Sequence, residues 1–376
     1  MNNWKFSLSS LPIVFTVLFL AGCGGGGSSQ TAAVTPLCRD AREPGHVCSV
    51  LFVGDSFTHG RYQPVRTFNG QKPDDPWRPP MVIDENYGHT GERAESKREY
   101  GPWGGIPAIF AELAEQKHLN YEVHIEAISE TSLEKNYRVA SDVIARPDWN
   151  GVVLQELSVK PYPSSLTKNP HSDPPGFWAS VQTIERAVHA VAPTSSIFLY
   201  ETWTSAELAR HLAGDPAAPD FHEKYLAALD ELGDANLASY QCAARRDGKI
   251  GGVAPVGEAW RLAWRDGLAN PDPFQSSSLP LLWYGIKAVN DPPIKEPDYH
   301  HPSIYGAYMS GLVLFVQMTG ADVRTLGANE QAAAHLGIPG DLAAQMQQEA
   351  WLTVKHVRRA AANKHKNPCK LVEAGQ

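Results

Sequence analysis

Residues 49–58 read SVLFVGDSFT, an apolar run that stops at Gly54 and is followed at once by polar side chains. The run at 49–54 is short and almost wholly apolar, which is the pattern of a strand buried on both faces of a sheet. Ser56 is therefore predicted at the carboxyl end of a strand, where a hydroxyl is exposed and backbone N–H groups can bind a developing oxyanion. Taken alone, this serine fits the N-cap of a following helix better than a nucleophile, because serine is a common N-cap.

Apolar runs of strand length alternate with helical segments along the rest of the chain. The five predicted strands are 49–54, 121–128, 151–155, 196–201 and 252–256. Apolar residues recur at helical spacing in 104–118, 177–191, 303–319 and 342–362. This alternation predicts an α/β fold: a three-layer α/β/α sandwich with a five-stranded, mainly parallel sheet.

Two long segments depart from this pattern. Residues 61–100 are polar and rich in Pro, Gly, Trp and Tyr, and residues 272–297 are similar in part. Irregular insertions of this length in a folded domain are usually functional or mobile. We expect both segments to contribute to the substrate-binding surface.

A second group of reactive side chains lies far downstream, in Asp298-Tyr299-His300-His301. A histidine that acts as a general base needs a carboxylate to fix its tautomer and to stabilise the imidazolium ion. The D-x-x-H spacing can place Asp298 and His301 on one loop turn, with the carboxylate behind the imidazole. His300 is an alternative base and Asp291 an alternative carboxylate; His301 is preferred because it completes the spacing.

Together, the two motifs resemble a known family. Gly54-Asp55-Ser56-Phe57-Thr58 is similar to the first block of the SGNH/GDSL serine hydrolases, and Asp298-x-x-His301 is similar to their last block. The order of the motifs is also that of the family, with the serine near the N-terminus and the Asp and His close together near the C-terminus. The resemblance extends from about residue 48 to 320. The G-x-S-x-G elbow of the α/β-hydrolases is absent. The resemblance implies a flavodoxin-like SGNH fold, a Ser56–His301–Asp298 triad and ester hydrolysis through an acyl-enzyme, with no cofactor or metal.

The middle blocks of the family are altered in this chain. The family has a glycine after its second strand and an asparagine after its third, and both help to hold the oxyanion. Here Ser129-Glu130 follow the second strand and Gln155 ends the third. The resemblance implies an oxyanion hole made of the backbone N–H groups of Ser56 and of Ser129 or Glu130, with the side-chain amide of Gln155. For Gln155, a structural hydrogen-bonding role is the alternative.

The N-terminus has the features of an export signal. Lys5 precedes a short apolar run, and Leu20-Ala21-Gly22-Cys23 looks like the lipobox of bacterial lipoproteins. The predicted organisation is a signal peptide at 1–22, a lipidated Cys23 with a flexible tether at 23–47, and one hydrolase domain at 48–376 with an insertion at about 61–100. The likeness implies a lipid anchor in the bacterial cell envelope, with the outer membrane favoured. An ordinary signal peptide with an incidental cysteine is the alternative.

The net charge and the cysteine content of the chain limit which partners and which bound groups are expected. The net charge of −8 argues against nucleic acid as a partner. Four cysteines remain after Cys23, an even number that fits two disulfides in an exported chain. Of three connectivities we favour Cys38–Cys48 with Cys242–Cys369. The chain has no C-x-x-C pair, so a zinc or redox site is not expected.

The substrate predicted for this chain is a small-molecule or glycan ester, such as an O-acyl group on carbohydrate. An acyltransferase using the same triad and a non-catalytic glycan-binding lipoprotein are the alternative functions. His59 is expected on a helix face rather than against the substrate. Trp77, Trp103 and Trp203 are expected in the core rather than stacked on a sugar.

Overall fold

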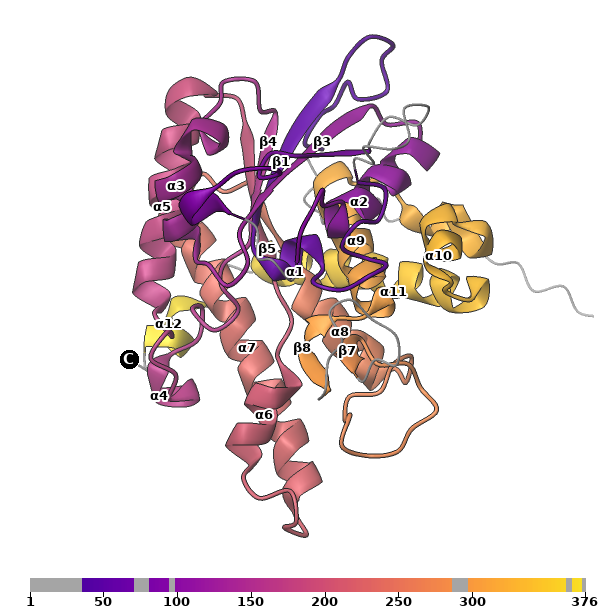
Figure 1. Cartoon of the computed structure of the whole chain (residues 1–376). Coiled ribbons are helices and arrows are strands. Elements are labelled where there is room, and N and C mark those ends of the chain that lie inside the picture. The colour runs from indigo at the N-terminus through magenta and orange to yellow at the C-terminus, as the bar shows by residue number, and fades with distance from the viewer. Residues whose placement is uncertain (1–35, 71–80, 95–98, 286–296, 363–366, 374–376) are drawn as a thin grey trace, which may run out of the picture. The chain divides into compact units, whose positions relative to one another are not determined.

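A six-stranded parallel sheet forms the centre of the computed structural model (Figure 1). The structure describes residues 36–70, 81–94, 99–285, 297–362 and 367–373. The strands are β1 (Cys48–Gly54), β2 (Val82–Asp84), β3 (Tyr121–Ala127), β4 (Gly151–Leu154), β5 (Ser196–Glu201) and β6 (Gly252–Pro255), in the order β2-β3-β1-β4-β5-β6. Without the edge strand β2, this is the flavodoxin-like order, and its switch point lies beside β1. The carboxyl end of β1, where a ligand site is expected, is the end that carries Ser56.

The predicted strand count was wrong by one. The extra strand, β2, lies inside the segment 61–100 that was expected to be irregular. It is only three residues long and pairs in parallel with β3, with Val82 opposite Val123 and Asp84 opposite Ile125. A strand this short has no periodicity that a sequence can show. The other five strands match their predicted positions to within two residues at either end.

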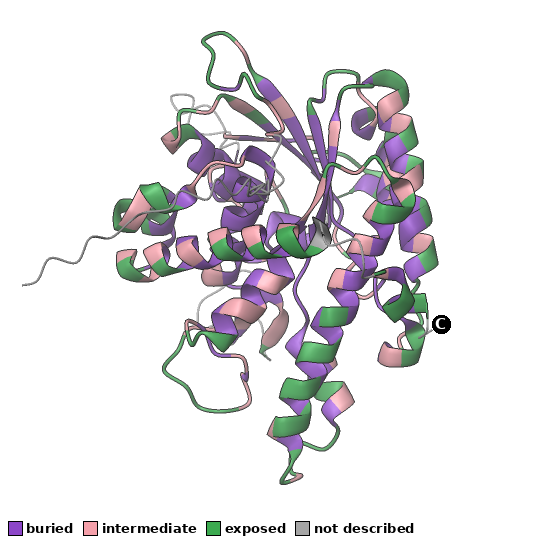
Figure 2. Cartoon of the chain, turned by 180° about the vertical axis from the view of Figure 1, so that it is seen from behind, coloured by how far each residue is buried: buried purple, intermediate pink, exposed green. Residues whose placement is uncertain are grey.

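Helices cover both faces of the sheet, as the α/β alternation predicted. The helices are α1 (Ser56–His59), α2 (Gly105–Gln116), α3 (Leu133–Ile144), α4 (Ser164–Thr167), α5 (Pro174–Val191), α6 (Ala206–Ala213), α7 (Phe221–Asp247), α8 (Val256–Arg265), α9 (Ile304–Thr319), α10 (Gln331–Leu336), α11 (Gly340–Ala362) and α12 (Cys369–Glu373), with 3-10 turns at Gly91–Arg93 and Val323–Asn329. Figure 2 shows that the strands are buried and that exposed residues lie on the outer faces of these helices.

Alternate side chains of β1 enter two separate apolar cores. Val50 and Phe52 pack with residues of α2, α8, α9 and α11, whereas Leu51 and Val53 pack with residues of α3 and α5. Helix α9 is buried along almost its whole length, from Gly306 to Thr319. A strand buried on both faces is continuously apolar, which is why the run at 49–54 could be recognised in the sequence.

The D-x-x-H motif lies on a strand rather than on a loop turn. Strands β7 (Trp283–Gly285) and β8 (Asp298–Pro302) form a separate two-stranded antiparallel sheet, in which Trp283 pairs with Pro302. Ser303 then caps helix α9, and its hydroxyl accepts hydrogen bonds from the backbone N–H groups at 305 and 306. The cap fixes the point at which β8 ends and the helix begins.

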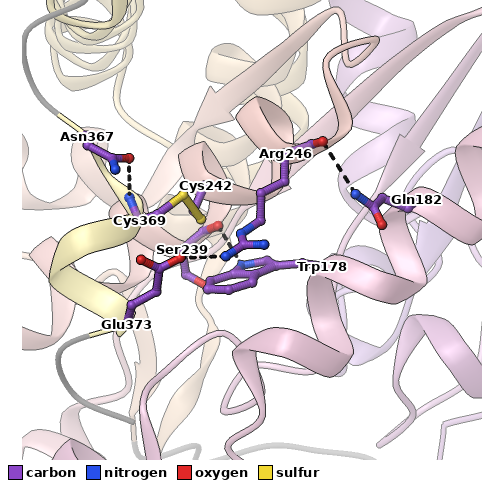
Figure 3. The surroundings of a disulfide bond; sticks show 8 residues. All are labelled: Trp178, Gln182, Ser239, Cys242, Arg246, Asn367, Cys369 and Glu373. Atoms are coloured by element: carbon purple, nitrogen blue, oxygen red, sulfur yellow. Dashed lines mark hydrogen bonds and ion pairs between the residues drawn. A yellow bond between two sulfur atoms is a disulfide. The ribbon is translucent and has the colours of Figure 1, made fainter.

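Both predicted disulfides are present, Cys38–Cys48 and Cys242–Cys369. Figure 3 shows the second, which joins α12 to α7. Beside it, Arg246 lies over the ring of Trp178 and forms an ion pair with Glu373. The last described helix is therefore held by a covalent bond and by a charged contact.

The predictions for the signal peptide and for lipidated Cys23 lie outside the described residues. Of the tether, residues 36–47 are described, and they precede β1 without forming a helix or strand. None of the helices in the described ranges is both long and apolar enough to cross a membrane.

Candidate active site

Ser56 is the first residue of α1, a single helical turn directly after β1. Asp55 caps this turn: its side chain accepts from the N–H of Phe57 (2.8 Å), and its carbonyl accepts from the N–H groups of Thr58 and His59. Among the described residues, the N–H of Ser56 is the one amide of this turn without an acceptor. Burial raises the pKa of the Asp55 carboxyl to about 7.

The turn requires a glycine at position 54. A Cβ atom there would lie 2.2 Å from Oγ1 of Thr58 and 2.4 Å from Oε1 of Gln155, well inside van der Waals contact. The glycine therefore lets the chain pass close beneath the nucleophile turn. This requirement explains why the sequence Gly54-Asp55-Ser56 predicts such a turn.

Ser56, His301 and Asp298 form a continuous chain of hydrogen bonds. The Oγ atom of Ser56 lies 2.9 Å from Nε2 of His301, although 245 residues separate them in the sequence. Nδ1 of His301 lies 2.8 Å from Oδ2 of Asp298. The structure thus brings together the three residues that the two motifs singled out, in the order hydroxyl, imidazole, carboxylate.

Asp298 is held by four donors. Its Oδ1 accepts from the backbone N–H groups of His300 and His301, both at 2.9 Å. Its Oδ2 accepts from His301 and from the hydroxyl of Tyr62, the latter at 2.7 Å. Burial would raise the pKa of Asp298, but the hydrogen bonds and charge of His301, with the bond from Tyr62, hold it well below its usual range. Asp298 is therefore held as an anion beside the imidazole of His301.

Tyr62 was missed by the sequence analysis. Burial and the neighbouring Asp298 raise its pKa, so the hydroxyl stays protonated and acts as a donor. Its ring stacks on Tyr284, with ring centroids 3.8 Å apart. Tyr62 lies in the irregular segment 61–100, and nothing in its spacing from Ser56 or Asp298 indicates the contact.

The neighbouring His300 points elsewhere. Its Nε2 lies 3.3 Å from Oγ of Ser158, and its ring packs against Phe57. Burial and the neighbouring His301 lower its pKa to about 3, so it is neutral. The geometry favours His301 over His300 as the base. The alternative carboxylate, Asp291, lies outside the described residues.

The side-chain amide of Gln155 contacts the nucleophile turn and its own backbone neighbour. Its side chain is fully buried beneath the nucleophile turn. Its Oε1 accepts from the N–H of Asp55 (2.9 Å) and from the hydroxyl of Thr58 (2.8 Å), while its Nε2 donates to the carbonyl of Glu156 (2.6 Å). Because Oε1 and one N–H of this buried amide hold the turn, the geometry favours the structural role that was the alternative.

The loop after β3 lies beside the nucleophile turn. The N–H of Ile128 donates to the carbonyl of Gly54 (3.1 Å), and Ser129 and Glu130 follow. In the described part of the chain, no acceptor is present for the N–H of either residue. Glu130 has φ +60°, the conformation that glycine adopts most easily, and its carboxylate is exposed. Two backbone donors of the predicted oxyanion hole therefore remain available, and the Glu130 side chain points to solvent.

Buried polar groups support this loop. His59 is fully buried, stacks on Trp103 (centroids 4.2 Å apart), and its Nε2 lies 2.9 Å from the hydroxyl of Ser129. The Ser129 hydroxyl donates in turn to Glu99, which forms an ion pair with Arg61. Burial, with the nearby positive charges, lowers the pKa of His59 well below its usual value. His59 therefore positions the loop as a neutral side chain.

An aromatic stack anchors the other side of the turn. Phe57 lies face to face with Trp203, with centroids 4.5 Å apart and ring planes 5° apart. Trp203 stacks in the same way on Trp260, at 4.3 Å and 2°. Trp103 and Trp203 are both buried, so their predicted core role is confirmed. Trp77 lies outside the described residues.

Solved structures give fold-level likenesses, whereas no family model and no curated protein matches the chain. A GDSL-like lipase from Parabacteroides merdae shares 16% identity over 73% of this chain and 95% of its own, with a TM-score of 0.41. The acetylxylan esterase Axe2 from Geobacillus stearothermophilus has the same identity and coverage, with a TM-score of 0.40. LAE5, an α/β hydrolase from the Lake Arreo metagenome, shares 14% identity over 72% of this chain and 94% of its own, at 0.39.

The chain has an α/β fold with helices on both faces of a parallel sheet whose strands β3-β1-β4-β5-β6 follow the flavodoxin-like order. This strand order, and the position of Ser56 beside the switch point of the sheet, are those that the sequence resemblance implied.

Proposed function

We propose that this protein is a serine ester hydrolase that works through an acyl-enzyme. One observation supports the proposal above all others: the unbroken path of hydrogen bonds from Ser56 through His301 to Asp298. A hydroxyl paired with an imidazole that is oriented by a buried carboxylate is the arrangement that activates serine as a nucleophile.

The proposed reaction has two halves. Oγ of Ser56 attacks the ester carbonyl while Nε2 of His301 takes its proton, and the Asp298 carboxylate stabilises the imidazolium ion. The N–H groups of Ser56 and of Ser129 or Glu130 hold the oxyanion. His301 then protonates the leaving alcohol, and water, activated by the same imidazole, releases the acid from Ser56. Without a side-chain amide from Gln155, the oxyanion hole relies on backbone donors alone.

We propose that the substrates are O-acyl esters, acetyl groups on carbohydrate among them, in the bacterial cell envelope. The support for the location is the sequence Leu20-Ala21-Gly22-Cys23, which fits acylation of Cys23 and anchoring in a membrane. Metabolic labelling with a radioactive fatty acid, beside a Cys23→Ser variant, tests the anchor. Label that persists in Cys23→Ser would refute it.

A fluorophosphonate probe, which reacts with activated serines, tests the chemistry on the purified protein. We expect labelling of the wild type and none of Ser56→Ala or His301→Ala. Ser158→Ala is the matched control, because this hydroxyl bonds to His300 rather than to His301. Labelling that survives in Ser56→Ala, or that disappears in Ser158→Ala alone, would contradict the proposal.

Hydrolysis of p-nitrophenyl esters of increasing chain length then measures turnover. An acyltransferase would use the same triad, so the products must be followed with and without a sugar acceptor. Release of free acid at an unchanged rate when the acceptor is present supports hydrolysis. Transfer of most of the acyl group to the sugar would favour the alternative.

A further inference from the structure

The loop after β3 carries the two candidate oxyanion donors in its backbone, the N–H groups of Ser129 and Glu130. The peptide planes that hold these two N–H groups meet at the Cα atom of Ser129. The orientation of this one residue therefore decides where both donors point. A glycine in this loop would have no side chain to be held, whereas Ser129 has a hydroxyl.

Two buried side chains hold the Ser129 hydroxyl. It donates a hydrogen bond to Oε2 of Glu99, and its Oγ lies 2.9 Å from Nε2 of His59. Because the hydroxyl proton goes to Glu99, Nε2 of His59 is the donor in the second contact. The side chains of Glu99 and His59 are 2% and 0% exposed, so water does not replace either partner. The Ser129 side chain cannot rotate without breaking a buried hydrogen bond.

Arg61 supplies the counter-charge for the buried carboxylate. Its Nε lies 2.9 Å from Oε1 of Glu99, and its Nη1 lies 3.9 Å from the exposed carboxylate of Glu130. A buried carboxylate is costly unless it is paired, and an unbalanced negative charge beside the donors would oppose a developing oxyanion. Arg61 comes directly after Gly60, the cap of helix α1, so it is fixed close to Ser56 in the chain.

Arg61 also contacts the other half of the site. Its guanidinium lies over the ring of Tyr62, 5.8 Å from the centroid, and the hydroxyl of Tyr62 donates to Asp298. The Arg61–Glu99 pair is therefore placed between the loop with the backbone donors and the residue that holds the catalytic carboxylate.

We propose that Glu99 is a positioning residue of the oxyanion hole. With its charge balanced by Arg61, its carboxylate fixes the hydroxyl of Ser129 and, through this residue, both N–H donors. The inference rests on the proposed esterase function, and it deepens it by naming what holds the donors in place before the oxyanion forms. A misplacement of about 1 Å in a catalytic group costs about a hundredfold in rate, so loss of the anchor is measurable.

Inhibition by trifluoroacetone, a ketone analogue of acetate esters, tests the position of the donors directly. Oγ of Ser56 adds to its carbonyl carbon, the proton passes to His301, and the carbonyl oxygen remains as an oxyanion. Glu99→Gln and Ser129→Ala weaken or remove the anchor and keep both backbone N–H groups. We expect the inhibition constant to rise about ten- to a hundredfold in each, with kcat/KM for p-nitrophenyl acetate reduced by the same factor. Ser129→Thr keeps a hydroxyl and should stay within about threefold of the wild type.

Glu185→Gln is the matched control. This carboxylate, on helix α5, is 4% exposed and pairs with Lys249 (3.1 Å) and with His189, so the variant also removes a buried charge from an ion pair. Urea unfolding measures the stability of every variant in parallel. We expect Glu185→Gln to leave the inhibition constant within twofold of the wild type, whatever its stability.

The outcomes separate this inference from the proposed function. A wild type that neither hydrolyses p-nitrophenyl acetate nor reacts with the fluorophosphonate probe would refute the esterase. With an active wild type, the inference is overturned if either Glu99→Gln or Ser129→Ala binds trifluoroacetone as tightly as the wild type, or if Glu185→Gln weakens binding to the same extent. If Glu99→Gln does not fold, Ser129→Ala alone decides between these results.

Discussion

The hydroxyl of Tyr62 and the imidazole of His301 donate to the same carboxylate oxygen, Oδ2 of Asp298, at 2.7 and 2.8 Å. Oδ1 of the same carboxylate accepts hydrogen bonds from the backbone N–H groups of His300 and His301. Together, these four hydrogen bonds fix the position of the carboxylate. Asp298 in turn determines where Nε2 of His301 points. Tyr62, which lies outside both motifs, therefore helps to orient the imidazole of His301 toward Ser56.

Replacing Tyr62 with phenylalanine tests this relationship. The ring and its stack on Tyr284 remain, and the hydrogen bond to Asp298 is lost. A hydrogen bond to a charged group contributes about 1.5–3 kcal/mol, so we expect kcat/KM to fall by about ten- to a hundredfold. Kinetics on p-nitrophenyl acetate measure this, with Tyr87→Phe as the control. An unchanged kcat/KM in Tyr62→Phe would show that the hydrogen bond from Tyr62 is not needed to position Asp298.

Substitutions can distinguish the roles of the two adjacent histidines, His300 and His301. His301→Ala should reduce kcat by about four orders of magnitude or more, because the base is lost. His300→Gln should leave kcat within about tenfold, since His300 contacts Ser158 and Phe57 and its pKa of about 3 keeps it neutral. Comparable losses in both variants would mean that the base has been assigned to the wrong imidazole, or that both take part.

Gln155→Ala distinguishes a structural amide from a catalytic one. In the structural role, its removal leaves the N–H of Asp55 and the hydroxyl of Thr58 buried without an acceptor. We expect the free energy of unfolding to fall by about 2–4 kcal/mol, by analogy with the cost of unsatisfied buried groups. Urea unfolding and kcat are to be measured together. A drop of two to three orders in kcat at unchanged stability would restore the oxyanion role.

The buried carboxyl of Glu156 predicts a pH-dependent stability. Burial raises its pKa to about 7, so the folded protein holds this proton more tightly than the unfolded chain does. Its contribution to stability is present below the ordinary pKa of 4.5 and is lost as the pH rises through 7. Glu156→Gln imitates the protonated form and should gain up to about 3 kcal/mol relative to the wild type between pH 4.5 and 8.

Urea unfolding at a series of pH values checks this difference. The exposed Glu115→Gln variant is the matched control. Parallel stability curves for Glu156→Gln and the wild type would show that the carboxyl has an ordinary pKa in the folded protein.

The fold could be predicted because its information is local. Strands β1, β4, β5 and β6 are short, largely apolar runs and β3 has an alternating pattern, so five of the six central strands were visible, and only the three-residue β2 was not. Ser56, Asp298 and His301 were found because their motifs survive in the sequence. The structural contacts of Gln155 could not be predicted, because its place directly after β4 is visible in the sequence, but the donors that reach its Oε1 follow the end of β1.

Tyr62 was out of reach for a related reason. It lies in the irregular segment 61–100, in which no periodicity relates one side chain to another. Contacts of this kind are decided by tertiary packing alone.

The stack of Phe57 on Trp203 and of Trp203 on Trp260 gives the molecule a spectroscopic handle. Phe57 is the residue next to Ser56, and its ring lies against the indole of Trp203. Any event that shifts the turn therefore changes the surroundings of this buried indole, which in turn stacks on Trp260. Tryptophan emission should therefore follow occupation of Ser56 in real time and without a dye. With ten tryptophans in the chain, a Trp203→Phe variant identifies which part of the signal comes from this reporter.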